Sequence, residues 1–295
     1  PAFTFGDDEI RGFWIGKYEL SSETPSATNG GGTSATLTAR ILPNVNSWRR
    51  NSVSNFSTVI QNMQTTNNIY GLGADKSLAD SHMLTNMEWG AVAYLTNSNY
   101  GRCTNGSCAG VTVNNCEKFI TGIGGDRVND KKSSTTCTTD ANKYNGPKGV
   151  LASTTGNIYG VYDMSGGADD YVMGNMSSTT DTYTFYPASS NFASSWYTGN
   201  QKYVITYANG STESDQTAYN RARLGDATGE VVLTTSSHGG WYSDYAFFSY
   251  SNDSWFKRGG YYDYGSGSGV FNFNHDSGAA HSSYSTRATL VSLSN

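Results

Sequence analysis

The apolar spacing of a helix occurs in only two stretches of this chain. This scarcity of helical spacing constrains the fold more than any other feature. Between Ser52 and Met63, apolar side chains recur three or four positions apart, which places them on one helix face. Thr85 and Glu88 have the spacing of a capping box, which predicts a second helix over Asn86 to Thr96. Most of the remaining sequence is β-prone or turn-rich. Two helices in such a sequence indicate an α+β fold and not alternating βαβ units.

Short strands are expected at several points. Gly12 to Leu20 is aromatic and bounded by turns, and Leu37 to Val45 is a short extended piece. Gly229 to Leu233 predicts a brief apolar strand, whereas Asn67 to Asp80 is predicted to be a loop. No internal repeat or long linker interrupts the chain, so we expect one domain over residues 1–295.

The charge balance argues against two kinds of partner. Lys and Arg number 19 against 24 Asp and Glu, and the basic residues form no cluster larger than a pair. Binding to phosphates needs a basic footprint, so no nucleic-acid partner is expected. No run of about 18 apolar residues occurs, so no direct membrane span is expected in this chain. The opening at Pro1 shows no signal peptide, which suits a mature or trimmed form.

Four cysteines lie close together in the middle of the chain. Cys103, Cys108, Cys116 and Cys137 allow three pairings. Structural zinc sites usually use tighter CxxC pairs, so two local disulfides, Cys103–Cys108 and Cys116–Cys137, are favoured over a metal site. Disulfides imply an oxidising compartment, and four reduced thiols are the alternative.

Motifs for metal binding or acid–base catalysis are weak. His275 and His281 lack the spacing of zinc proteases, so no metal site is assigned. The neighbours Asp169 and Asp170 would point to opposite faces of a strand and are not expected to act as a catalytic pair. No cofactor is expected. A structural calcium ion at Gly225 to Glu230 is left open, although no EF-hand pattern supports it.

The closing segment from Gly259 to Arg287 has an unusual composition. Its 29 residues include no Lys, Glu, Gln, Met or Trp, and small, polar and tyrosine residues dominate. Tyr offers large contact area at low entropic cost, and Ser, Gly and Asn offer adaptable hydrogen bonds, as in evolved recognition surfaces. An ordinary polar β surface is the alternative. The residues expected to be fixed by the fold are Arg258, Gly259, Gly260, Val270, Phe271, Phe273 and Arg287.

The polar and aromatic positions between these anchors are expected to face solvent together and to bind a ligand. Three residues upstream of the closing segment extend this group. The expected ligand-binding residues are Trp241, Tyr242, Asp244, Tyr261, Tyr262, Asp263, Tyr264, Ser266, Asn272, Asn274, His275, Asp276, Ser277, His281, Ser282, Ser283 and Tyr284.

Four segments, in order, resemble formylglycine-generating-enzyme-like domains. They are GFWIGKYEL at Gly12 to Leu20, TNMEWGAVAY at Thr85 to Tyr94, YGVYDMSGGADDYV at Tyr159 to Val172, and KRGG at Lys257 to Gly260 together with the end at Arg287. The resemblance spans almost the whole chain. It implies a C-type lectin fold, with a twisted antiparallel sheet, two helices and long loops displayed on one side.

The departures from that family argue against catalysis. Members that oxidise a substrate cysteine bind copper through a cysteine pair in the closing segment, and no cysteine follows Cys137 here. The family's usual Trp-Glu after the Gly-Gly turn is Asp169-Asp170 in this chain. The protein is therefore expected not to be an enzyme. A formylglycine-generating-type oxidase that uses copper or another metal is the alternative.

The closing segment also resembles the variable region of proteins diversified by diversity-generating retroelements. Their mutagenesis at Asn-type codons cannot produce Lys, Glu, Gln, Met or Trp, the five types absent from Gly259 to Arg287. The resemblance implies a variable region at about 241–287 on a receptor or adhesin at a bacterial surface, a pilus-like appendage or a phage tail. Its ligand would be a protein or glycan on another cell or on a phage or host surface. A lectin with fixed, calcium-dependent carbohydrate specificity is a further alternative.

Overall fold

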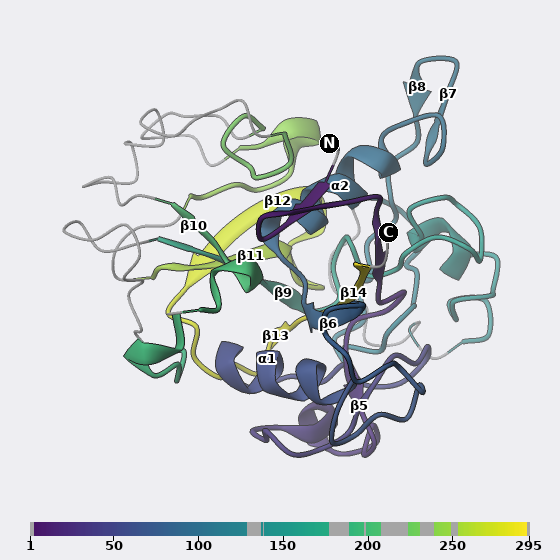
Figure 1. Ribbon diagram of the computed structural model, residues 1–295. Helices are drawn as coiled ribbons and strands as arrows, with labels where there is room; N and C mark the ends of the chain where they lie inside the picture. Colours follow the sequence, from purple (N-terminus) through teal and green to yellow (C-terminus); the bar gives the residue numbers. More distant parts are fainter. Residues whose placement is uncertain are drawn as a thin grey trace.

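The computed structural model describes residues 3–128, 137, 139–176, 189–197, 199–207, 224–230, 239–248 and 253–293. Within them the chain forms two α-helices and several small sheets, most of them antiparallel, joined by long connections. The protein therefore has a mixed α+β fold in which sheet predominates, as the scarcity of helical spacing predicts (Figure 1).

The largest sheet brings together the middle and the end of the chain. Its order is β10-β9-β11-β12, and the short β13 also pairs with β9. β11 is antiparallel to its two neighbours, β9 and β12, while β10 and β13 run parallel to β9. The strands are β9 (Asp169–Met176), β10 (Ile205–Tyr207), β11 (Trp255–Gly259), β12 (Gly269–Asp276) and β13 (Tyr284–Ser285).

A second sheet joins the two ends of the chain in the order β3-β14-β6, and the remaining strands pair locally. The hairpin of β7 and β8 projects from the body of the molecule (Figure 1). These strands are β1 (Phe3–Phe5), β2 (Asp8–Ile10), β3 (Phe13–Ile15), β4 (Ser21–Ser22), β5 (Ala39–Arg40), β6 (Ala79–Met83), β7 (Cys103–Thr104), β8 (Ser107–Cys108) and β14 (Ala288–Ser292).

Several expected strands are shorter than predicted, and one predicted loop ends in a strand. The piece at Gly12 to Leu20 keeps only β3 as a strand, and Leu37 to Val45 keeps only the two residues of β5. The predicted loop at Asn67 to Asp80 is wrong at its end, because β6 begins at Ala79 and pairs with β14. Polar residues in β6 hide this strand from sequence patterns. Of the strand expected at Gly229 to Leu233, residues 231–233 lie outside the described part.

Both predicted helices are confirmed. α1 (Val53–Asn62) is capped by the Ser52 side chain, which accepts a hydrogen bond from the backbone N–H of Asn55. α2 (Asn86–Thr96) has the full capping box: Thr85 accepts from the Glu88 N–H, and the Glu88 carboxylate accepts from the Thr85 N–H. Capping of this kind satisfies N–H groups that a helix start otherwise leaves unpaired.

The large sheet separates two apolar cores. α1 contributes to one core, together with Tyr171 and Trp255, and α2 contributes to the other, together with Phe256 and Phe273. Neighbouring residues of β11 alternate between the two sides, as a strand requires. Both faces of this sheet are therefore covered, which limits how many of its side chains reach solvent.

The expected anchors of the closing segment are buried, as predicted. The Arg258 side chain donates to the Asn86 side-chain oxygen at 2.8 Å and to the Asn272 carbonyl at 2.8 Å. Burial lowers the pKa of Arg258 to about 10. Phe271, Phe273 and Arg287 are also fully enclosed. These contacts join the start of α2 to β11 and β12.

The two predicted cysteine pairs are confirmed. Cys103–Cys108 closes the hairpin of β7 and β8, and Cys116–Cys137 closes a longer loop. Among the residues that the structure describes, no helix is long and apolar enough to cross a membrane.

Candidate functional site

The candidate site begins where β11 ends, at two glycines in the left-handed region. Gly259 has a φ of +88° and Gly260 a φ of +70°. A Cβ at Gly259 would lie 3.0 Å from the indole of Trp89, so the chain passes close to α2 there. Glycine is the residue that adopts this conformation at low cost. The turn directs residues 261–267 out of the sheet, and the chain then re-enters the sheet as β12.

Three tyrosines of this loop, Tyr261, Tyr262 and Tyr264, gather with Tyr245. We call these four residues the tyrosine cluster. The ring centroid of Tyr261 lies 4.4 Å from that of Tyr264 and 5.3 Å from that of Tyr262, and Tyr245 lies 5.9 Å from Tyr264. All four rings are partly exposed. The two contacts of Tyr261 are edge-on, a geometry that favours one arrangement of the rings. The cluster thus presents aromatic surface from a defined position.

A buried ion pair lies beside the tyrosine cluster. The Lys257 ammonium is 3.5 Å from Asp169 and 3.8 Å from the ring centre of Tyr284. The Tyr284 hydroxyl donates to Asp276 at 2.8 Å. Burial raises the pKa of Tyr264 and Tyr284 above the ordinary value, so both hydroxyls stay protonated at neutral pH.

The loop from Ser277 to Tyr284 forms the second part of the site. His281 and Ser282 are exposed, while their backbone carbonyls accept hydrogen bonds from the Arg50 N–H and the Arg49 side chain. The ring centroid of His281 lies 4.2 Å from that of Tyr284. The backbone of this loop is therefore held by the region just before α1 while side chains reach solvent.

Most of the expected ligand-binding residues do reach solvent, fully or in part. Trp241 and Tyr242 are 44% and 63% exposed. Ser266, His281 and Ser282 are exposed as well. The partly exposed residues are Tyr261, Tyr262, Asp263, Tyr264, His275, Asp276, Ser277, Ser283 and Tyr284.

Three of the expected residues do not face solvent, and the prediction of exposure is wrong for them. Asp244 is only 6% exposed and accepts a hydrogen bond from the Phe271 N–H at 2.9 Å. Asn272 is fully buried and donates to the Gly267 carbonyl at 2.8 Å. Asn274 is also buried, and its side-chain oxygen accepts from the His275 N–H at 2.9 Å. Loop 261–267 covers the face of β12 that carries Asn272 and Asn274, so these two polar side chains do not reach solvent although they alternate with apolar ones.

His275 is mostly enclosed as well. Its ring packs edge-on against Phe247, with centroids 4.8 Å apart, and burial lowers the pKa of the imidazole to about 4. His275 is therefore neutral at physiological pH. Its side chain has more of a packing role than a solvent-facing one.

The exposed residues lie on two sides of β12, not on one continuous patch. Trp241 and Tyr242 pack against Phe271, with centroids 5.5 and 5.6 Å away, on the side of α2. The tyrosine cluster lies on the side of Asn272, which is opposite to Phe271 on the strand. Tyr245 links the two groups, because its N–H donates to Gly267 and its carbonyl accepts from the Phe273 N–H.

The loop at Gly225 to Glu230 uses its carboxylates internally. Asp226 accepts from the backbone N–H and the hydroxyl of Thr228, at 2.9 and 2.6 Å, and Glu230 accepts from Gly225 and Gly229. Both carboxylates thus stabilise the conformation of this loop. Across the described ranges, no three His, Cys, Asp or Glu side chains gather closely enough to hold a metal ion.

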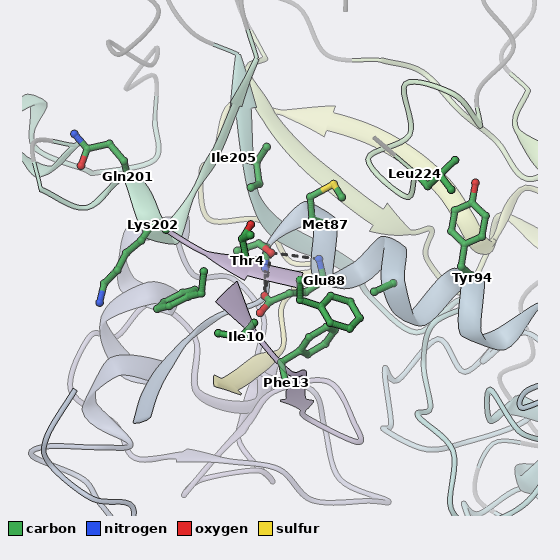
Figure 2. A pocket seen from close by; sticks show the side chains of 15 residues that line it. Thr4, Ile10, Phe13, Met87, Glu88, Tyr94, Gln201, Lys202, Ile205 and Leu224 are labelled. Atoms are coloured by element: carbon green, nitrogen blue, oxygen red, sulfur yellow. Dashed lines mark hydrogen bonds between the residues drawn. The ribbon is translucent and has the colours of Figure 1, made fainter. Parts of the chain in front are cut away.

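Sequence patterns missed an apolar hollow of about 730 Å³ between β1, the start of α2 and β10. Figure 2 shows Met87 and Ile205 on one side of it and Ile10 and Phe13 on the other. Its walls come from four distant parts of the chain, so periodicity could not reveal it. The one available signal is that α2 is apolar on more than its core-facing side.

The carboxylate in this hollow is already engaged. One oxygen of Glu88 accepts from the Thr85 N–H at 2.8 Å, and the other lies 3.0 Å from His82 Nε2 (Figure 2 draws the capping bonds as dashed lines). Glu88 therefore caps α2 and is not a free acid or base. The hollow offers mainly apolar contact surface.

Comparison with protein-family models and with curated proteins finds no match to this chain. The structure itself defines a mixed α+β protein with two disulfides and a partly exposed aromatic surface at the end of its largest sheet.

Proposed function

We propose that this protein is a non-enzymatic receptor or adhesin that binds its ligand through exposed and partly exposed residues of its closing segment, together with Trp241 and Tyr242 just upstream. We call these residues the C-terminal surface: Trp241, Tyr242, Tyr261, Tyr262, Asp263, Tyr264, Ser266, His281, Ser282, Ser283 and Tyr284. The observation that carries the proposal is the tyrosine cluster, which is partly exposed although the strands on either side of its loop are buried. Tyr is enriched in interfaces because it combines large contact area with a polar tip.

Backbone contacts support the division into a fixed scaffold and changeable side chains. The Tyr262 N–H donates to the Gly167 carbonyl at 3.0 Å, and the Asp169 N–H donates to the Ser283 carbonyl at 3.0 Å. These bonds do not depend on which side chain occupies positions 262 and 283. Side chains could therefore vary without loss of the loop conformation, as retroelement diversification of a lectin-type fold would require.

The proposal also covers the location of the protein. Two disulfides suit an oxidising compartment, and we place the protein outside the cell, at a bacterial surface, on a pilus-like appendage or on a phage tail. The ligand would be a protein or glycan on another cell, phage or host surface. The closing segment contains no cysteine for copper–thiolate chemistry, which favours binding over oxidation.

The test is binding of fluorescent multimers of the protein to a panel of bacterial cells and phage particles. A variant with Tyr242, Tyr261 and Tyr264 all changed to Ser is expected to bind at least about tenfold more weakly, because aromatic residues dominate interface energetics. A control with the exposed Leu78 and Ile69 changed to Ser should bind as the wild type does. Equal binding by wild type and the tyrosine variant, or unfolding of that variant, would contradict the proposal.

The neighbouring DNA tests diversification separately. A reverse transcriptase gene and an imperfect repeat of the segment that encodes Gly259 to Arg287 are expected nearby. Their absence would leave a binding protein of fixed specificity.

A further inference from the structure

A second exposed feature is a groove of about 580 Å³ along the outer side of α2. It opens beside the apolar hollow of Figure 2, since Phe3, Phe13, Ala91 and Tyr94 line both. Its volume lies within the range of about 300–1,000 Å³ that ligand sites occupy. It borders the C-terminal surface at Tyr94, which packs against Trp241 with centroids 5.8 Å apart.

Two unusually exposed tyrosines line this groove. Tyr100 is 85% exposed and Tyr159 is 84% exposed, and they come from segments about 60 residues apart. Rings left in water to this extent add little to folding through burial, because hydrophobic stabilisation is proportional to the area removed from water. Their convergence on one groove therefore calls for an explanation outside folding.

The backbone at both tyrosines is held in place. The Tyr100 N–H donates to the Ser98 hydroxyl at 3.1 Å, and the Tyr159 N–H donates to the Asn157 side chain at 2.8 Å. Each tyrosine is followed by a glycine with no room for a side chain: a Cβ at Gly101 would lie 2.3 Å from a backbone oxygen. A Cβ at Gly160 would lie 2.6 Å from the Thr155 hydroxyl. The two rings thus project from fixed positions.

The lining of the groove is neutral. Among the described residues that line it there is no Asp, Glu, Lys or Arg. Ser98 and Thr155 contribute hydroxyls to a mostly apolar lining. The Ser98 hydroxyl donates to the Leu95 carbonyl and accepts from the Tyr100 N–H, and the Thr155 hydroxyl donates to the Asn157 side-chain oxygen, so each oxygen keeps a lone pair. A charged ligand would lose its hydration without gaining a partner here.

We propose that this groove binds a neutral oligosaccharide whose sugar rings stack on Tyr100 and Tyr159, without calcium. A sugar ring presents a face of C–H bonds, which the electron-rich face of an aromatic ring attracts, and hydroxyls at its edge. This matches a groove that combines aromatic rings with hydroxyls and excludes charge. Calcium is not needed, because no carboxylate lines the groove to hold it. The groove is separate from the ligand site of the C-terminal surface.

The test is binding of the purified full chain to immobilised maltohexaose, cellohexaose, mannohexaose and triacetylchitotriose, followed by calorimetry with the soluble sugar retained best. Tyr100→Ala with Tyr159→Ala is expected to weaken binding at least about tenfold, since two stacked rings are lost. Trp14→Ala is the matched control, because Trp14 is 73% exposed but lies outside the groove. Addition of a calcium chelator should leave affinity unchanged.

Outcomes separate this inference from the proposed function. Sugar binding that survives in the Tyr242, Tyr261 and Tyr264 variant but is lost in the Tyr100 and Tyr159 variant supports the groove. No binding to any of the four sugars, binding equal in wild type and the groove variant, or binding that a chelator abolishes would overturn it. Concentration-dependent dimerisation that the groove variant alone loses would instead assign the groove to a second copy of this chain and overturn the proposal.

Discussion

The Arg287 guanidinium donates from Nε to the Asp170 carboxylate across 2.7 Å, and neither side chain is exposed to solvent. The pair joins β9 to the last residues before β14, 117 positions apart in sequence. Burial raises the pKa of Asp170 to about 7, and the charge of Arg287 opposes that shift. The ion pair therefore holds the closing segment to the middle of the sheet.

Removal of one member of this pair should be costly. Asp170→Ala leaves a buried guanidinium without its partner, and we expect a loss of about 3–5 kcal/mol in the free energy of unfolding. Replacement of both residues, as Asp170→Val with Arg287→Met, should cost clearly less. Urea denaturation of the three proteins measures this. A loss below about 1 kcal/mol in the single variant would show that the pair adds little to stability.

Stability should also respond to pH through Asp244. Burial raises the pKa of this carboxyl to about 7, so the folded protein binds its proton more tightly than the unfolded chain does. Between about pH 4 and pH 7 the folded state therefore carries more protons, and this group's contribution to stability falls as pH rises. Asp244→Asn, which stays neutral, should flatten that slope.

Thermal unfolding from pH 4 to pH 8 tests the Asp244 prediction. Asp263→Asn, at a partly exposed position of the same segment, is the control and should keep the wild-type slope. A slope unchanged by Asp244→Asn would assign the pH dependence to other buried acids.

The turn at Gly259 should tolerate no side chain. Gly259→Ala places a Cβ 3.0 Å from Trp89 at a φ of +88°, and we expect a loss of about 1–3 kcal/mol. Gly12→Ala is the matched control, because nothing lies within 4 Å of the added Cβ there. Guanidinium denaturation compares the two variants. Equal stability would mean that the turn relaxes freely.

The two disulfides should contribute unequally. Cys103 and Cys108 are 5 positions apart, whereas Cys116 and Cys137 are 21 apart. A disulfide stabilises a protein by restricting its unfolded chain, and more so when it closes a longer loop. On this basis Cys116–Cys137 should add about 3 kcal/mol to the free energy of unfolding, and Cys103–Cys108 about 2 kcal/mol. Paired Cys→Ser variants, measured by calorimetry, should follow this order. The reverse order would point to a role of the β7–β8 hairpin in packing beyond loop closure.

The sequence alone determined those features that depend on neighbours in the chain. The capping box at Thr85 and Glu88 placed α2, and apolar spacing placed α1, because helix contacts repeat every three or four residues. Close spacing of the cysteines favoured the pairs that form. The large apolar anchors Phe271 and Phe273 were also predicted to be buried, because their side chains carry no polar group that needs solvent.

Only the tertiary structure decided which polar residues reach solvent. Alternation on β12 separates Phe271 from Asn272, but it cannot show that loop 261–267 folds back over the second face and buries the asparagine. The same strand places Tyr242 and Tyr261 on different sides, although the sequence suggested one patch. Tyr100 and Tyr159 come to line one groove because segments far apart in the chain pack together there. Such long-range contacts leave no periodic trace in the sequence, and they determine which side chains a ligand can reach.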